Sequence, residues 1–227
     1  MAFAGDRLVE LIHALEDETE RMVVLARHSA REFNRDRHDL LNPLTDEGRD
    51  LARRLGQAIP AGFHVRGYAS PPERCMETAE LALAGYQERG GSVGRHRAVE
   101  GLGVFYALDQ RRMWKAMSKV VEPGGSFGLA GFVSAWGAGE MSSDTMMPAD
   151  LAAQMVLEVL KGKLRQQGEG PQIDLCVSHD LTIMMLRHQL LGLVPEDWPV
   201  EFLDGVVLFE KDGELSLASD TGHRIQV

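Results

Sequence analysis

Three short apolar runs in this 227-residue chain are each followed by side chains that can bind an anion or move a proton. These side chains are Arg27 and His28, Arg74, and His179 and Asp180. Arginine carries a planar fork of donors that matches phosphoryl oxygens, and phosphoryl transfer needs mainly positioning and positive charge. Imidazole is a competent nucleophile near neutral pH, so one histidine could attack while the other donates a hydrogen bond or a proton. The set indicates phosphoryl transfer, provided that the fold brings the three positions together.

The apolar runs themselves are typical of strands buried in a parallel sheet, and they lie at 22–26, 65–69 and 173–178. Next to these runs in the chain, apolar residues recur with helical spacing at 6–20, 151–164 and 181–191. A closing strand pair is predicted at 206–209 and 215–218. Strands that alternate with helices indicate an α/β fold of three layers, with a mostly parallel sheet between helices. Ligands bind at the carboxyl ends of strands in such sheets, so we expect the three positions in one crevice.

Two helix starts are predicted from capping residues. Thr45 precedes Asp46 and Glu47, which suit the positive end of a helix dipole. Ser70 and Glu73 have the spacing of a capping box, which predicts that Ser70 caps the helix carrying Arg74.

The chain has no repeat, low-complexity tract or linker, and we expect a single domain over residues 1–227. The glycine-rich stretch 101–148 breaks the strand–helix alternation and is interpreted as a cap-like insertion over one edge of the sheet. Arg111, Lys115 and Lys119 recur there at i, i+4 spacing, which would form a basic stripe on a helix. The default interpretation is a solvated face; the alternative hypothesis is a contact with a second anionic group on the substrate.

The composition excludes several classes of protein. A formal net charge of −10 is unsuited to a general binder of nucleic acid or of an anionic membrane. Two cysteines, and no cluster with the spacing of metal ligands, predict neither a disulfide framework nor a metal, and we expect no cofactor. The expected partner is a small phosphorylated substrate and the expected location is the cytoplasm, while the choice between a monomer and a homodimer stays open.

Four segments resemble the histidine phosphatase superfamily, which has the phosphoglycerate mutase-like fold. They are 25–29, similar to its Arg-His-Gly signature; 44–48, similar to Leu-Thr-x-x-Gly; 69–79, similar to Ser-Pro-x-x-Arg-x-x-x-Thr-Ala; and 178–180, similar to its second catalytic histidine. The segments occur in the order of the family and span most of the chain.

The resemblance implies that His28 is the residue phosphorylated during the reaction, and that a phosphate pocket surrounds it. The implied phosphate-binding residues are Arg27, Arg74 and His179, with Arg31 at a position used by the acid-phosphatase branch and Asn34 at one used by the mutase-like branch. Ser29 stands where the family usually has glycine, which either narrows the loop or adds a hydroxyl donor.

The proton donor is ambiguous, because the resemblance offers two carboxyl groups. Asp180 follows the acid-phosphatase branch, whereas Glu100 lies in a segment that resembles the donor segment of the mutase-like branch. The His-Asp pair at 179–180 favours Asp180.

The predicted activity is metal-independent hydrolysis of a small phosphomonoester through a phosphohistidine on His28. A phosphoglycerate mutase-like phosphotransferase is the alternative within the family. A different class, a serine esterase, is suggested by the G-x-S-x-G pattern at 124–128 with Ser126 as nucleophile, followed by Asp204 and His223 in the order of that class.

Overall fold

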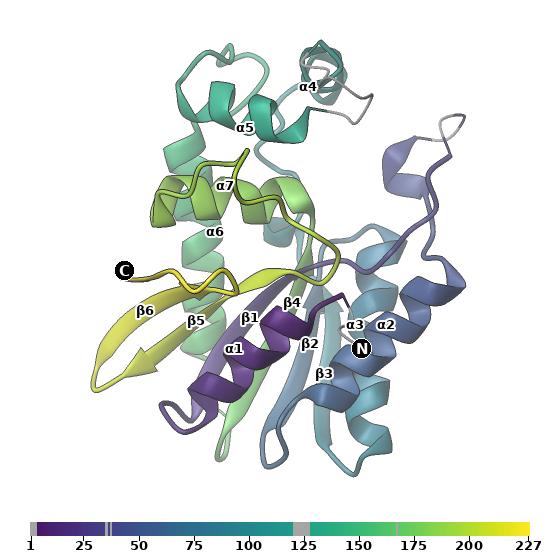
Figure 1. Cartoon of the computed structure of the whole chain (residues 1–227), viewed down its shortest axis with the longest axis vertical. Coiled ribbons are helices and arrows are strands. Elements are labelled where there is room, and N and C mark those ends of the chain that lie inside the picture. Colours follow the sequence, from purple (N-terminus) through teal and green to yellow (C-terminus); the bar gives the residue numbers. More distant parts are fainter. Residues whose placement is uncertain (1–3, 35, 37, 120–127, 167) are drawn as a thin grey trace.

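A computed structural model describes residues 4–34, 36, 38–119, 128–166 and 168–227, and a seven-stranded sheet forms the centre of this part of the chain (Figure 1). The strands are β1 (Arg21–Arg27), β2 (His64–Ala69), β3 (Ser92–Ala98), β4 (Gln172–Ser178), β5 (Gly205–Lys211), β6 (Glu214–Ser219) and β7 (Arg224–Gln226). The helices are α1 (Asp6–Glu16), α2 (Asp46–Ala58), α3 (Glu73–Glu88), α4 (Gln110–Met117), α5 (Leu129–Gly137), α6 (Ala149–Leu164) and α7 (Asp180–Leu191), with short 3₁₀ helices η1 (Asp39–Leu41) and η2 (Glu100–Leu102).

The sheet has the strand order β3-β2-β4-β1-β5-β6-β7. The first four strands are parallel neighbours, whereas β5, β6 and β7 join by antiparallel pairing. In the register of β1 and β4, Arg27 pairs with Ser178, and in that of β2 and β4, Ala69 pairs with Val177. The carboxyl ends of β1, β2 and β4 therefore lie at one edge, where the next residue of each strand comes close to the others.

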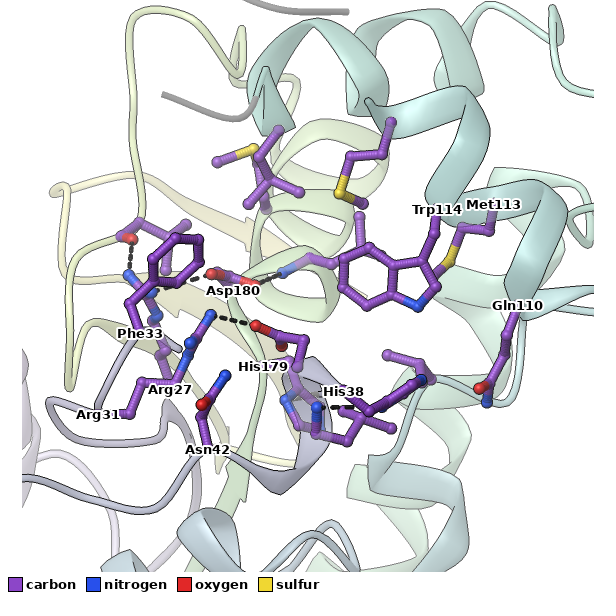
Figure 2. A pocket seen from close by; sticks show the side chains of 18 of the residues that line it. Arg27, Arg31, Phe33, His38, Asn42, Gln110, Met113, Trp114, His179 and Asp180 are labelled. Carbon is purple, nitrogen blue, oxygen red and sulfur yellow. Dashed lines mark hydrogen bonds and ion pairs between the residues drawn. The ribbon is translucent and has the colours of Figure 1, made fainter. Parts of the chain in front are cut away.

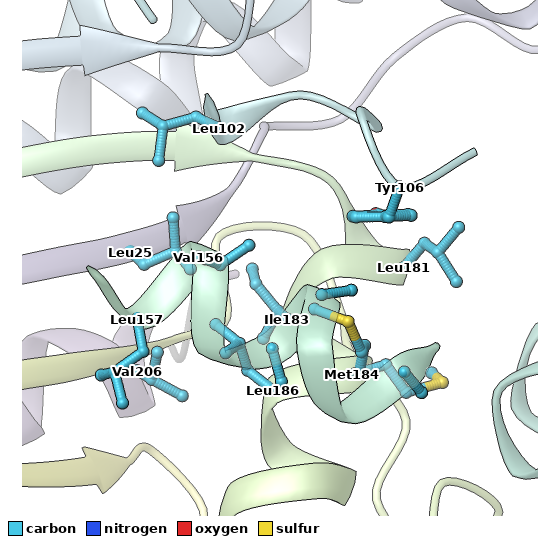
Figure 3. Packing of buried hydrophobic residues seen from close by; sticks show 14 of the residues in the cluster. Leu25, Leu102, Tyr106, Val156, Leu157, Leu181, Ile183, Met184, Leu186 and Val206 are labelled. Carbon is cyan, nitrogen blue, oxygen red and sulfur yellow. The ribbon is translucent and has the colours of Figure 1, made fainter. Parts of the chain in front are cut away.

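Successive residues of β1 point to opposite faces of the sheet and pack against different helices, as the two-residue period of a strand requires. Val23 and Leu25 belong to the core shared with α5, α6 and α7, and Figure 3 shows part of this packing. Met22 and Val24 belong to the core shared with α1 and α3. The predicted three-layer α/β fold with a mostly parallel sheet is thus confirmed.

Two edge strands, β3 and β7, were not expected from the sequence. The residues of β3 are all exposed or partly exposed, because this strand has a neighbour on one side alone and little helix cover. An edge strand of this kind needs no apolar run and is commonly protected by charge, which Arg95 and Arg97 supply here.

The two predicted helix starts have different outcomes. Thr45 caps α2 as predicted, since its hydroxyl accepts a hydrogen bond from the Gly48 amide at 3.0 Å. The prediction that Ser70 caps α3 is wrong: the N-cap of α3 is Pro72, which makes no side-chain cap. Ser70 instead bonds to His179, because the chain between Ser70 and α3 leaves its hydroxyl at the carboxyl edge of the sheet.

Within 101–148, the described residues form α4 and α5, which lie together beyond α7 at the top of Figure 1. Of the predicted basic stripe, Arg111 and Lys115 are exposed on α4, and Lys119 lies beyond the end of that helix. No helix in the described residues is both long and apolar enough to cross a membrane.

Candidate active site

The carboxyl ends of β1, β2 and β4 gather the side chains that the sequence singled out. His28, Ser70 and His179 are each the first residue after one of these strands. Arg74 reaches them from the first turn of α3. Five buried or half-buried side chains form what we call the basic pocket: Arg27, His28, Arg31, Arg74 and His179.

His28 is held in one orientation by hydrogen bonds to both ring nitrogens. Its Nδ1 lies 2.8 Å from the carbonyl oxygen of Ser29, which can only accept, so Nδ1 carries the proton. Nε2 is then unprotonated, and it accepts a hydrogen bond from Arg74 Nε at 3.0 Å. The loop behind it is fixed as well: Thr45 N donates to Ala30 O at 3.1 Å, and a Cβ on Gly48 would lie 1.9 Å from that same oxygen. The spacing of Thr45 and Gly48 thus supports the loop that carries His28.

His179 stands beside His28 at a ring-centroid distance of 5.7 Å, edge toward face. Arg74 Nη2 approaches its Nδ1 at 3.4 Å; since arginine only donates, Nδ1 accepts. Nε2 then carries the proton and donates to Ser70 Oγ at 2.9 Å.

Burial favours the neutral form of both imidazoles. It lowers the pKa of His28 well below its ordinary 6.5, and the nearby positive charge of Arg74 lowers it further. Burial and Arg74 likewise lower the pKa of His179 to about 3. Cys75 lies 3.8 Å from His179, but burial raises the pKa of its thiol to about 12, so it stays protonated. The nucleophilic atom available in the pocket is therefore a neutral imidazole nitrogen.

Arg27 is oriented by three contacts. Its Nη1 donates to Val200 O at 2.7 Å, its Nη2 lies 3.0 Å from Asp180 Oδ2, and its guanidinium stacks 4.2 Å from the ring centre of Phe202. Its Nε is buried and makes no hydrogen bond within the described residues. A buried donor without an acceptor costs free energy, which an oxyanion in the pocket would relieve.

A carboxylate already bridges two of the arginines. Asp39, the first residue of η1, lies 2.6 Å from Arg31 and 3.1 Å from Arg74, and its carbonyl oxygen accepts from Arg74 Nη1 at 2.7 Å. The positions of these oxygens show that Arg31 and Arg74 can hold one anion between them. Sequence reasoning missed Asp39, because nothing in a loop sequence marks a carboxylate that folds back onto two arginines.

The two candidate proton donors lie in different surroundings. The Asp180 side chain is 29% exposed, pairs with Arg27, and accepts from the backbone amide of Leu181 at 2.8 Å. Burial would raise the pKa of Asp180, but the positive charge of Arg27 and the hydrogen bond from the Leu181 amide hold it below its usual value. Glu100 is exposed at the start of η2 and lines a smaller cavity of about 560 Å³ together with Ser70 and His179.

The remaining predicted residues contribute less to the basic pocket. Asn34 is exposed, and its side-chain oxygen accepts from the Asp36 amide at 2.8 Å. The buried Asn42 was not predicted and orders the same loop through a bond to Asn34 N at 3.2 Å. Ser29 is fully buried and its hydroxyl has no partner in the described residues, while its amide donates to Thr78 Oγ1 at 3.1 Å.

Ser126, the nucleophile of the esterase alternative, lies outside the described residues. Its two suggested partners are engaged elsewhere: Asp204 accepts from Arg7 at 2.6 Å, and His223 bonds to Thr221 at 3.0 Å. Among the described residues, no group of three or more His, Cys, Asp or Glu is placed to hold a metal ion.

A larger cavity of about 830 Å³ opens from the basic pocket. Figure 2 shows Arg27, His179 and Asp180 facing the same space as Met113 and Trp114 of α4. We call this larger cavity the apolar cavity, because hydrocarbon lines most of its far side, away from the basic pocket. Residues of this far side include Met113, Trp114, Met117, Leu129, Met184 and Val200.

Part of the sequence matches a known protein family, and the fold matches solved structures. Residues 23–90 match the model of the histidine phosphatase superfamily, branch 1. No curated protein matches the sequence. Solved structures share the fold at low sequence identity, and they include a mutase and several phosphatases.

A phosphoglycerate mutase from Bacillus anthracis str. Sterne has a TM-score of 0.57 at 19% identity, covering 89% of this chain and 93% of that one. A phosphoserine phosphatase mutant from Entamoeba histolytica, in complex with phosphoserine, has a TM-score of 0.51 at 18% identity, covering 91% and 95%. A mycobacterial glucosyl-3-phosphoglycerate phosphatase has a TM-score of 0.52 at 16% identity, covering 91% and 96%. The predicted resemblance is confirmed: residues 23–90 match the histidine phosphatase superfamily, and the chain has the phosphoglycerate mutase-like fold.

Proposed function

We propose that this chain hydrolyses a phosphomonoester through a phosphohistidine on His28. The observation that carries the proposal is the unprotonated Nε2 of His28, which lies buried among arginines that can bind an anionic phosphoryl group. Family and fold support the same chemistry, since the matching family is that of histidine phosphatases and the similar structures are phosphatases and a mutase.

In the first step, His28 Nε2 attacks phosphorus and the bond between phosphorus and the leaving oxygen breaks. The leaving oxygen takes a proton from a carboxylic acid and departs as an alcohol. In the second step, water attacks phosphorus, the carboxylate takes the water proton, and the bond from phosphorus to Nε2 breaks to release phosphate. Arg27, Arg31 and Arg74 stabilise the equatorial oxygens in both steps.

Arg74 has a further role at the attacking atom. Its Nε–H points at the lone pair of His28 Nε2, which keeps that nitrogen from taking up a proton. When a phosphoryl group arrives, this donor can pass from nitrogen to a phosphoryl oxygen. The same anion must displace the Asp39 carboxylate from Arg31 and Arg74.

The assignment of the donor now favours Glu100 over Asp180, which the sequence favoured. A general acid must hold a proton before the leaving oxygen departs. The ion pair with Arg27 holds the pKa of Asp180 below its usual value and so opposes the protonation that a general acid needs. Glu100 lines the smaller cavity, which shares His179 and Gln110 with the larger one, and it makes no ion pair with an arginine or lysine in the described residues.

Hydrolysis is favoured over transfer to a small anionic acceptor because of what lies next to the basic pocket. The arginines that line the larger cavity are Arg27 and Arg31, which already belong to the basic pocket. A mutase-like reaction would need a second set of cations for its other anionic group.

Trapping the intermediate tests the proposal. Brief incubation with radiolabelled phenyl phosphate should leave an acid-labile, base-stable label on His28. His28→Asn should carry no label and show no turnover, whereas Ser126→Ala should behave as wild type, and excess chelator should leave turnover unchanged. Turnover that persists in His28→Asn, or a label on Ser126, would overturn the proposal.

A further inference from the structure

The cap helices set the chemistry of the space into which a leaving group must extend. The apolar cavity begins at the basic pocket and continues under α4 and α5. Its volume of about 830 Å³ lies in the range of cavities that hold a whole small molecule. A phosphoryl group held by Arg27, Arg31 and His179, the basic-pocket residues that line this space, fills one end of it alone.

The sorting of side chains on α4 is informative. Met113 and Met117 are 2% and 6% exposed, and together with Trp114 they line the apolar cavity. Arg111 and Lys115 are exposed and do not line it. The hypothesis that the basic stripe binds a second anionic group on the substrate therefore has no support from the structure.

The charged groups that line the cavity beyond the basic pocket would repel an anion instead of binding it. Beyond the basic pocket, the charged lining includes the carboxylate of Glu201, and the polar lining consists of amides and an imidazole such as Gln110 and His38. Methionine is the most adaptable apolar side chain, and Met113, Met117 and Met184 together give a wall that can adjust to hydrocarbon of different shapes.

We propose that the substrate is a phosphomonoester whose alcohol carries a long hydrocarbon, with the phosphate in the basic pocket and the hydrocarbon in the apolar cavity. This inference rests on the proposed function and specifies the leaving group. Sugar phosphates and compounds with a second anionic group are disfavoured, because polar groups that reach the hydrocarbon of the far side would lose water without gaining partners there.

A series of n-alkyl phosphates from ethyl to octyl tests the proposal directly. The alcohols are almost equally basic, so chain length changes binding without changing the chemistry. Transfer of one methylene from water contributes about 0.8 kcal/mol, which corresponds to about fourfold in kcat/KM for each added carbon. We expect kcat/KM to rise by about this factor per carbon, through KM, until the cavity is full.

Variants locate the effect. Trp114→Gln and Leu129→Gln, both at partly buried positions of the cavity wall, should flatten the dependence of kcat/KM on chain length. Lys115→Ala, next to Trp114 on the exposed side of α4, is the matched control and should keep the wild-type slope. A terminal carboxylate on the octyl chain should lower kcat/KM by at least tenfold.

The outcomes separate this inference from the proposed function. Hydrolysis of ethyl phosphate with no gain for longer chains would overturn the hydrocarbon substrate and leave the phosphatase standing. A gain from the terminal carboxylate that Lys115→Ala abolishes would also overturn it and would assign the basic stripe to the substrate. No hydrolysis of any member, and no label on His28, would overturn both.

Discussion

The basic pocket and the apolar cavity adjoin each other, yet they are built by different means. The basic pocket is made of residues that end a strand, lie within a few residues after one, or lie in the first turn of a helix, and polar contacts orient their side chains. The apolar cavity is lined from helices and loops distant in sequence, and its methionines make no directional contacts. Under the two proposals above, rigid polar geometry would set the reaction type, and adaptable hydrocarbon would set the preference for a leaving group.

The largest expected effect comes from a change in the basic pocket that leaves the apolar cavity intact. Arg74→Ala removes the donor to His28 Nε2 and the guanidinium that pairs with the Asp39 carboxylate, so kcat should fall about 10³-fold or more. The loss should be equal for ethyl and octyl phosphate, because Arg74 does not line the apolar cavity that holds the leaving group. Arg74→Lys keeps the charge without the planar fork, so its kcat should lie between those of Arg74→Ala and the wild type. Steady-state kinetics on both substrates decide it, and a loss confined to one chain length would break the division.

Removal of the proton donor should have the next largest effect. Glu100→Gln should slow ethyl phosphate hydrolysis by about 10²–10⁴-fold, and 4-nitrophenyl phosphate much less, because a good leaving group departs without a proton. Asp180→Asn should slow both substrates by similar factors, since it disturbs Arg27. The opposite pattern would return the donor role to Asp180.

The basic pocket should also make stability depend on pH, whereas the apolar cavity should not. His28 has a lowered pKa in the folded chain, so below about pH 6.5 the unfolded chain binds a proton that the folded chain does not. The free energy of unfolding therefore falls as the pH falls, by about 1.4 kcal/mol per pH unit for one such histidine.

Denaturant unfolding between pH 6.5 and 5 measures this slope. His28→Gln should reduce it by about that amount, and Trp114→Gln should leave it unchanged. Asp220 acts in the opposite direction, since burial raises its pKa to about 6, but it is present in all three proteins and cancels in the comparison. An equal slope in His28→Gln and wild type would contradict the neutral, buried imidazole.

The smallest expected effect concerns the internal carboxylate. Asp39→Asn removes the charge that competes with phosphate for Arg31 and Arg74, so the inhibition constant of inorganic phosphate should fall about tenfold. Asp36→Asn removes the same charge from an exposed position of the same loop. An equal change in both variants would indicate a general charge effect rather than displacement of Asp39.

Much of this molecule follows from local sequence. Apolar runs predict β1, β2 and β4, and the residues after them predict which side chains meet, because parallel strands align their carboxyl ends. The cap at Thr45 is also local, since its hydroxyl needs an amide three residues away. The edge strands β3 and β7 escaped prediction because strands with little cover need no apolar pattern.

The tertiary structure decided what depends on partners distant in the chain. Ser70 has the sequence of a helix cap, yet it bonds to His179, 109 residues away. Asp180 follows His179 directly in the chain, but its ion pair with Arg27, 153 residues away, sets its surroundings. The sides of α4 are distinct in sequence, and packing alone determined that the methionines line the cavity while Arg111 and Lys115 stay in solvent. Which groups could react follows from the sequence, because residue types and strand ends are local properties. Protonation, orientation and the space for a leaving group arise from burial and charge contributed by the whole fold.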